Sequence, residues 1–107
     1  MKKFTVEWTK NAQFDLEEII TYIKMDSVSI AKKIFFEIKK ECDELYYMPE
    51  RKRIVPELQQ IGILNYREII YKRWRIIFKI EQERVYVLVV ADSSRNLEDI
   101  LLQRLIK

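Results

Sequence analysis

Both prolines and the only glycine of this 107-residue chain lie in one stretch, PERKRIVPELQQIGILN, at residues 49–65. Proline and glycine interrupt helices and strands, so this stretch is expected to be an irregular connector. The remainder of the chain contains neither residue, which predicts regular elements on both sides of the connector and few, short loops. The type of each element then follows from the spacing of its apolar residues.

The segment before the connector is expected to hold one strand and two helices. FTVEWT, residues 4–9, alternates apolar and polar side chains and predicts a half-buried strand. Two apolar stripes at helical spacing follow, and the short link MDSVS between them favours an antiparallel hairpin. Thr9 or Asn11 is the expected N-cap of the first helix, and Pro49 ends the second. The stripes consist of Ala12, Leu16, Ile19, Ile20 and Ile23, and of Ala31, Ile34, Phe35, Ile38, Cys42 and Leu45.

The segment after the connector is expected to hold three strands, at residues 66–71, 73–81 and 84–92, with EQE turning between the last two. VYVLVVA in the last strand is apolar at both parities, which is typical of a central strand covered on both faces. NLEDILLQRLIK predicts a helix with Asn96 as its N-cap.

The predicted fold class is α+β, in the order β-α-α-β-β-β-α. A helical hairpin is expected to pack on a mainly antiparallel four-stranded sheet, with a C-terminal helix at the end of the chain. Residues 1–107 are expected to form a single domain, because a chain of this length with 49% hydrophobic residues suffices for one core but not for two.

The strand within YKRWRIIFKI, residues 71–80, predicts one apolar and one basic face. Read with a period of two, Trp74, Ile76 and Phe78 share one side of the strand. If the helical hairpin covers that side, the other side is left toward solvent or a partner. The cations expected around this open face are Arg73, Arg75 and Lys79 on the strand, Arg67 and Arg95 at neighbouring strand ends, and Arg51, Lys52 and Arg53 on the connector. We interpret them as an anion-binding or partner-binding face, the alternative being ordinary solvated charges.

Charge and composition narrow the class of protein. The net charge is +3, and residues 49–107 hold twelve Lys and Arg against eight Asp and Glu, whereas residues 1–48 hold eight against nine. This asymmetry favours an anionic partner, either nucleic acid or an acidic polypeptide. No apolar run approaches the ~20 residues of a membrane span, and MKKFTVEWTK lacks the apolar stretch of a signal peptide, so a cytoplasmic protein is expected. With no histidine and with Cys42 as a lone buried thiol, neither a zinc site nor another cofactor is predicted.

The ordered set RKRIVPEL, YREIIYKRWRIIFKI, VYVLVV and SRNLEDILLQRL resembles the RelE/ParE superfamily of toxins from bacterial type II toxin–antitoxin systems. The resemblance covers nearly the whole chain. Its most specific parts are the run from Val55 to Leu58, the run from Tyr66 to Glu68, Arg75 within the next strand, and Arg95 just past the last strand. The helix-hairpin spacing and the ending RNLEDILLQRL look closer to the ParE-like branch. The resemblance implies a cytoplasmic toxin of a plasmid-stabilisation type, bound by an acidic antitoxin, in a homodimer or a toxin–antitoxin hetero-oligomer.

Three functions remain open from this resemblance. A ParE-like member inhibits DNA gyrase by binding it, without chemistry of its own. A RelE-like member cuts messenger RNA on the ribosome; the family pattern then implies that Arg75 and Arg95 hold the phosphate, that Arg67 assists, and that Glu57 or Lys52 serves as the base. An inactive member only binds its antitoxin. The absence of histidine, and of tyrosine after Tyr86, weighs against efficient RNA cleavage and favours the ParE-like function, but leaves open whether the chain is an enzyme.

Overall fold

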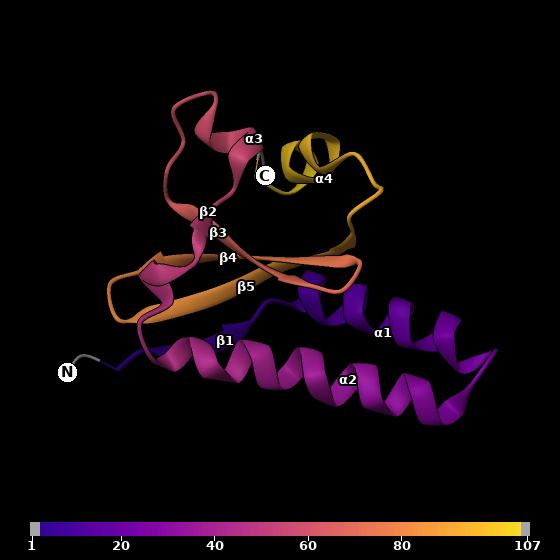
Figure 1. The fold of residues 1–107 in the computed structure, drawn as a ribbon. Helices are drawn as coiled ribbons and strands as arrows, with labels where there is room; N and C mark the ends of the chain where they lie inside the picture. The colour runs from indigo at the N-terminus through magenta and orange to yellow at the C-terminus, as the bar shows by residue number, and fades with distance from the viewer. Residues whose placement is uncertain (1–2, 106–107) are drawn as a thin grey trace.

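The computed structural model describes residues 3–105; the outermost residues of the predicted 1–107 domain lie outside this range. The described chain forms an α+β fold in the predicted order of helices and strands (Figure 1). The sheet has five strands where four were predicted, because the connector supplies a short strand of its own. The elements are β1 (Thr5–Trp8), α1 (Lys10–Lys24), α2 (Val28–Asp43), η1 (Glu44–Tyr46), η2 (Pro49–Arg51), β2 (Arg53–Ile54), α3 (Pro56–Gln59), β3 (Tyr66–Tyr71), β4 (Trp74–Glu81), β5 (Arg84–Asp92) and α4 (Leu97–Leu105).

The strands are arranged in the order β1-β5-β4-β3-β2. β1 runs parallel to β5, and every other neighbouring pair is antiparallel, which confirms the mainly antiparallel sheet. β3, β4 and β5 are joined by two tight turns in which Lys72 (φ 52°) and Gln82 (φ 56°) adopt the left-handed conformation that two-residue hairpins require. The first of these turns includes Arg73, so β4 begins at Trp74 and not at the predicted residue 73.

The helical hairpin covers one face of the sheet (Figure 1). Each of its helices begins at a side-chain cap: the Thr9 hydroxyl accepts a hydrogen bond from the Ala12 N–H, and the Ser27 hydroxyl accepts one from the Ile30 N–H. The predicted stripes face the sheet and meet its apolar side chains, with the exception of Phe35, which was expected in the second stripe but is 37% exposed. The buried residues of this core are Phe4, Ala12, Leu16, Ile34, Ile38, Cys42, Leu45, Ile69, Trp74, Ile76, Phe78, Val85, Val87 and Val90.

The opposite face of the sheet carries a second core, which corrects the expectation of an open basic face. α3 and α4 lie over it, on the other side of the sheet from α1 and α2 (Figure 1). The connector is thus not irregular throughout: Pro56 starts a short helix, which packs Leu58 against the sheet together with α4. This core consists of Val55, Leu58, Ile77, Val89, Ala91, Leu97, Ile100 and Leu101. Asn96 caps α4 as predicted, since its Oδ1 accepts a hydrogen bond from the Asp99 N–H.

A bulge in β5 links the two layers. Ile77 and Phe78 are consecutive in β4 but pair with Val89 and Val87, which leaves Leu88 as an extra residue in β5. Beyond Trp8, no strand within residues 3–105 pairs with this edge of β5, and side chains take its place. Asp15 accepts a hydrogen bond from the Val90 N–H (3.0 Å), and Arg104 donates one to the Leu88 carbonyl (2.9 Å). Asp15 and Arg104 also bind each other through two hydrogen bonds of 2.7 and 2.8 Å. α4 is thereby fixed to α1 and to the sheet at once.

None of the helices within residues 3–105 is both long and apolar enough to cross a membrane.

Candidate functional site

Arg75 lies at the centre of a cluster of charged residues, which we call the Arg75 cluster and which comprises Arg53, Glu57, Glu68 and Arg75. The Arg75 Nη1 and Nη2 donate to the two carboxylate oxygens of Glu57 at 2.7 and 2.8 Å. Its Nε donates to Glu68 at 2.8 Å, and Arg53 donates to the other oxygen of Glu68 at 2.5 Å. Two cations and two carboxylates thus form one nearly closed set of ion pairs.

The sequence brings these residues together through strand register. Ile70 pairs with Arg75 across the β3–β4 hairpin, so Glu68, two residues earlier on β3, shares the face of Arg75. Arg53 pairs with Glu68 across β2 and β3. Glu57 comes from the first turn of α3 and reaches Arg75 from above the sheet. Glu68 is fully buried and the Arg75 side chain is 11% exposed, so the cluster lies between α3 and the sheet rather than on an open face.

Hydrogen bonds within the cluster keep Glu57 and Arg75 charged. Hydrogen bonds from Arg75 hold the pKa of Glu57 below its ordinary value, and the hydrogen bonds to Glu57 and Glu68 raise the pKa of Arg75, against the effect of burial. A phosphate could reach this guanidinium only by displacing Glu57 from its bidentate contact. Glu57, as a carboxylate already bound at both oxygens, is a poor proton acceptor. The cluster therefore stabilises the position of α3 and, as it stands, has no free group poised for acid–base chemistry.

The depressed pKa of Glu57 predicts acid sensitivity. A carboxyl group whose pKa is lower in the folded than in the unfolded state stabilises the fold at pH values above its unfolded value, here near 4.5, and that contribution is lost as the pH falls through the folded-state pKa. The urea midpoint of the wild-type protein is expected to fall between about pH 6 and about pH 3. The variant Glu57→Gln is expected to show a shallower dependence. Parallel pH profiles for the two proteins would contradict a role of the Glu57–Arg75 pair in acid sensitivity.

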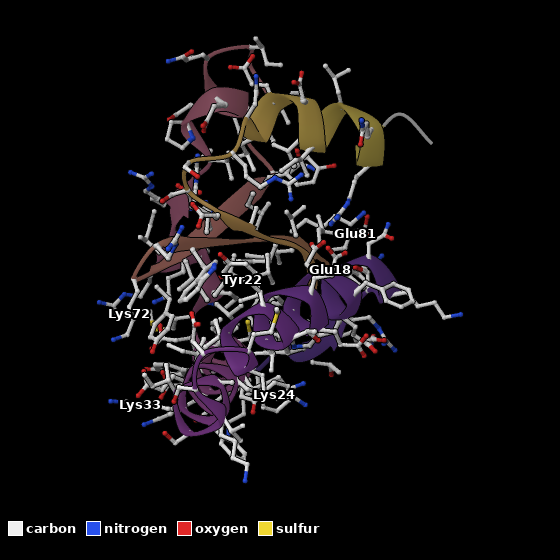
Figure 2. The ribbon with its side chains drawn as sticks, turned by 90° about the vertical axis from the view of Figure 1, so that its right-hand side faces the viewer. Glu18, Tyr22, Lys24, Lys33, Lys72 and Glu81 are labelled. Carbon is white, nitrogen blue, oxygen red and sulfur yellow. The ribbon has the colours of Figure 1, made fainter. Side chains whose placement is uncertain are left out.

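The other cations predicted for the site are spread over several parts of the fold. Arg67 donates to the Lys52 carbonyl at 2.6 Å, which ties β3 to the connector. The Lys52 side chain is exposed, as is that of Arg51 in η2. Lys79 pairs with Glu81 at 3.1 Å and lies over the Tyr86 ring. Figure 2 shows how widely further basic side chains are separated: Lys72 lies at the level of the sheet, whereas Lys24 and Lys33 lie on the helical hairpin.

Asp92 organises the corner that follows β5, where two more predicted residues lie. Arg73 donates to Asp92 at 2.5 Å, whereas Arg95, whose side chain is exposed, contacts Asp92 only through a backbone hydrogen bond of 3.0 Å to its carbonyl. The pKa of Asp92 is lowered, first by hydrogen bonds from the Ser94 N–H and hydroxyl and then by Arg73. Of the predicted residues, the structure brings Arg53, Glu57 and Arg75 into one cluster and leaves the others outside it.

Sequence reasoning missed Glu68, Asp15 and Arg104 as organising residues. A signal for Glu68 was present, because a two-residue turn after Tyr71 fixes the hairpin register that places Glu68 beside Arg75. Asp15 and Arg104 are separated by 89 residues and meet only through the docking of α4, for which no local pattern exists.

The fold and the family match described next place the chain among the small α+β toxins of the RelE/ParE superfamily. Residues 6–97 match the family described as ParE toxin of type II toxin-antitoxin system, parDE, and because this match covers most of the chain, the chain belongs to that family. Among solved structures, the fold is similar to a chain of the chromosomal ParDE toxin–antitoxin system from P. aeruginosa, with a TM-score of 0.69, 16% identity, and coverage of 84% of this chain and 96% of that one. It is also similar to a chain of the RelBE2 toxin–antitoxin complex from Mycobacterium tuberculosis, with a TM-score of 0.61, 16% identity, and coverage of 84% and 98%. No curated protein matches the sequence.

Proposed function

We propose that this toxin arrests growth in the ParE-like manner, by binding DNA gyrase and inhibiting it, without chemistry of its own. The observation that carries the proposal is the state of Arg75: all three of its guanidinium nitrogens donate to Glu57 or Glu68. The residue expected to hold phosphate in an RNA-cleaving site is thereby bound to the residue expected to act as the base. The match to the ParE family over residues 6–97 supports the same branch.

The RelE-like alternative requires groups that this chain does not present together. In-line attack by a 2′-hydroxyl needs a base, cations at the phosphate and an acid for the leaving oxygen. The sequence has no histidine, and the pKa of Glu57 is lowered, which rules that carboxyl out as the acid at neutral pH. Arg95 and Lys52 are exposed and remain available, but they lie outside the Arg75 cluster.

An acidic antitoxin is the partner that we propose for the cation-rich connector. Both similar structures belong to toxin–antitoxin systems. Arg51, the last residue of η2, and Lys52, which lies between η2 and β2, present exposed charges. Opposite charges accelerate the encounter of two proteins, while burial of apolar groups slows their dissociation. A toxin–antitoxin hetero-oligomer is the assembly expected from this docking.

Two assays run in parallel test the proposed target. The purified protein is expected to inhibit gyrase supercoiling, and its expression is expected to stop growth without new cut sites in ribosome-bound messenger RNA. Two variants separate the mechanisms: Glu57→Gln removes the proposed base while keeping the shape of the side chain, and Arg95→Ala removes an exposed phosphate ligand.

Loss of message cleavage in either variant, with supercoiling unaffected by the wild-type protein, would establish the RelE-like mechanism. A protein that still binds its antitoxin but causes no growth arrest, no message cleavage and no gyrase inhibition would be an inactive member.

A further inference from the structure

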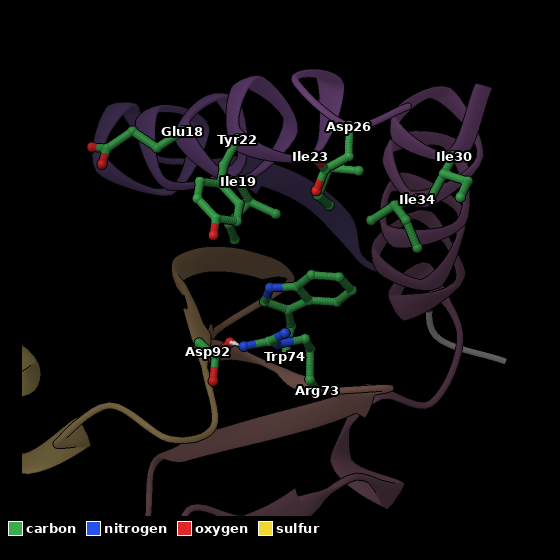
Figure 3. Close-up of a pocket in the computed structure, with 10 residues that line it drawn as sticks. All are labelled: Glu18, Ile19, Tyr22, Ile23, Asp26, Ile30, Ile34, Arg73, Trp74 and Asp92. Carbon is green, nitrogen blue, oxygen red and sulfur yellow. Dashed lines mark hydrogen bonds and ion pairs between the residues drawn. The ribbon is translucent and has the colours of Figure 1, made fainter. Parts of the chain in front are cut away.

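A groove of about 550 Å³ opens between the tip of the helical hairpin and the start of β4 (Figure 3). The indole of Trp74 rises from the sheet toward α1 and α2 and forms the floor of this groove. The apolar part of the lining consists of Ile19, Tyr22 and Ile23 from α1, Ile30 and Ile34 from α2, and Trp74. Six apolar or aromatic side chains from three elements thus surround one space beside the core.

The mouth of the groove is apolar and open to solvent. Tyr22 is 74% exposed and Ile30 is 54% exposed, and Met25, the residue that follows α1 at the hairpin tip, is 81% exposed. Large apolar side chains gathered in this way at the rim of a cavity mark a binding surface, whereas single exposed ones do not. None of the described contacts within the chain covers this rim.

The charge of the groove is opposite to that of the whole chain. Its charged residues are Glu18, Asp26, Asp92 and Arg73, which sum to −2, whereas the chain carries +3. Arg73 and Asp92 neutralise each other at 2.5 Å, as the dashed line in Figure 3 shows. Among the ion pairs within residues 3–105, none involves Glu18 or Asp26. In Figure 3 the Asp26 carboxylate points toward the groove, whereas the Glu18 side chain extends away from it, and the charge of Glu18 helps to raise the pKa of Arg104. Asp26 is therefore the charge that a ligand of the groove would meet.

We propose that this groove binds a partner segment in which a basic side chain is flanked by apolar residues. The apolar walls take the flanking residues, Tyr22 and Trp74 offer ring surfaces to the stem and head of a lysine or arginine, and Asp26 attracts its charge. The proposal goes beyond gyrase inhibition and does not depend on it. It also assigns different partners to the groove and to the connector, because the acidic groove would repel an acidic antitoxin segment.

A second copy of the chain is a less suitable occupant. Its Arg51–Arg53 stretch has the right charge, but the groove and that stretch are different surfaces. The apolar residues near the two ends of that stretch, Pro49 and Val55, are buried in its own fold and cannot flank an arginine inside the groove. The occupant to which we commit is a basic and apolar segment of another protein.

The fluorescence of Trp74 provides a direct test. The chain has two tryptophans, so in the background Trp8→Phe the emission reports on the groove alone. The probe is a capped peptide, Ser-Leu-Leu-Arg-Leu-Leu-Ser, and its counterpart carries glutamate in place of arginine. The arginine peptide is expected to shift or quench the emission with saturation, and the glutamate peptide is expected to have no effect at the same concentrations.

Matched variants locate the site. Asp26→Lys removes one attraction and adds one repulsion, and it is expected to weaken binding of the arginine peptide about tenfold. Glu17→Lys makes the same change in net charge on an exposed part of α1 outside the groove and is expected to change the affinity by less than about twofold. Equal weakening by both variants, equal binding of both peptides, or no change in Trp74 emission would overturn the proposal. So would a concentration-dependent dimer in sedimentation that the arginine peptide dissociates, since the occupant would then be a second copy.

Discussion

Replacement of Arg75 by alanine is expected to lower the free energy of unfolding by about 3–5 kcal/mol, the range found when one partner of a buried ion pair is removed. The reason is the burial of the Arg75 cluster: Glu68 is fully buried and would keep only the pairing with Arg53, whose side chain is 56% exposed. Glu57 would lose both of its hydrogen bonds to the sheet, and α3 would lose its polar attachment. Urea unfolding followed by far-ultraviolet circular dichroism measures the change.

The neighbouring variant Arg73→Ala is the matched control. Arg73 is exposed and pairs with Asp92 at the surface, so its loss is expected to change the unfolding free energy by no more than about 0.5 kcal/mol. The double variant Arg75→Ala with Glu68→Ala is expected to cost less than the sum of the two single changes, because the second removes the charge that the first leaves unpaired. Equal effects of Arg73→Ala and Arg75→Ala would mean that the cluster contributes no more than a surface pair.

Replacement of Trp74 by alanine is expected to destabilise the protein by a similar amount, roughly 3–5 kcal/mol, but through loss of packing. Trp74 is 8% exposed, belongs to the core under the helical hairpin, and is stacked on Tyr71 with ring centroids 6.4 Å apart. Thermal and urea unfolding both measure the effect. Phe14→Ala is the control: it deletes an aromatic ring that is 59% exposed on α1 and is expected to cost about 0.5 kcal/mol or less. If Trp74→Ala proved as mild as Phe14→Ala, the side of β4 assigned to the hairpin core would be wrong.

The strands and helices of this fold could be predicted from the sequence where a short-range pattern determines them. β3 and β5 have the predicted bounds, and Thr9 and Asn96 cap their helices, because alternation, turns and caps act over a few residues. The side of β4 that carries Trp74, Ile76 and Phe78 lies in the hairpin core as predicted.

The second layer was missed although one signal pointed to it. A strand such as β5 that is apolar at both parities needs cover on both faces, and an open basic face beside it is incompatible with that requirement. The cover comes from Leu58 and Leu101, which belong to short elements with little periodicity of their own. Arg75 was therefore expected to face a partner, whereas the structure pairs it with Glu57 from the same connector. How a connector folds over a sheet depends on tertiary packing, which a local pattern does not contain.

Leu88 is the bulge residue of β5, and it reverses the face to which the residues after it point. Val85 and Val87 face the helical hairpin, whereas Val89 and Ala91, at the same parity, face α3 and α4, because the extra residue reverses the alternation midway along the strand. A homologous chain lacking Leu88 would form a regular strand in which Val87 and Val89 still point to opposite faces, and it would lose only the carbonyl that Arg104 binds. An alignment with a homologous chain that opens a one-residue gap at Leu88 therefore keeps every later side chain of β5 on its own face, and such a gap marks the loss of the bulge and not a change of fold.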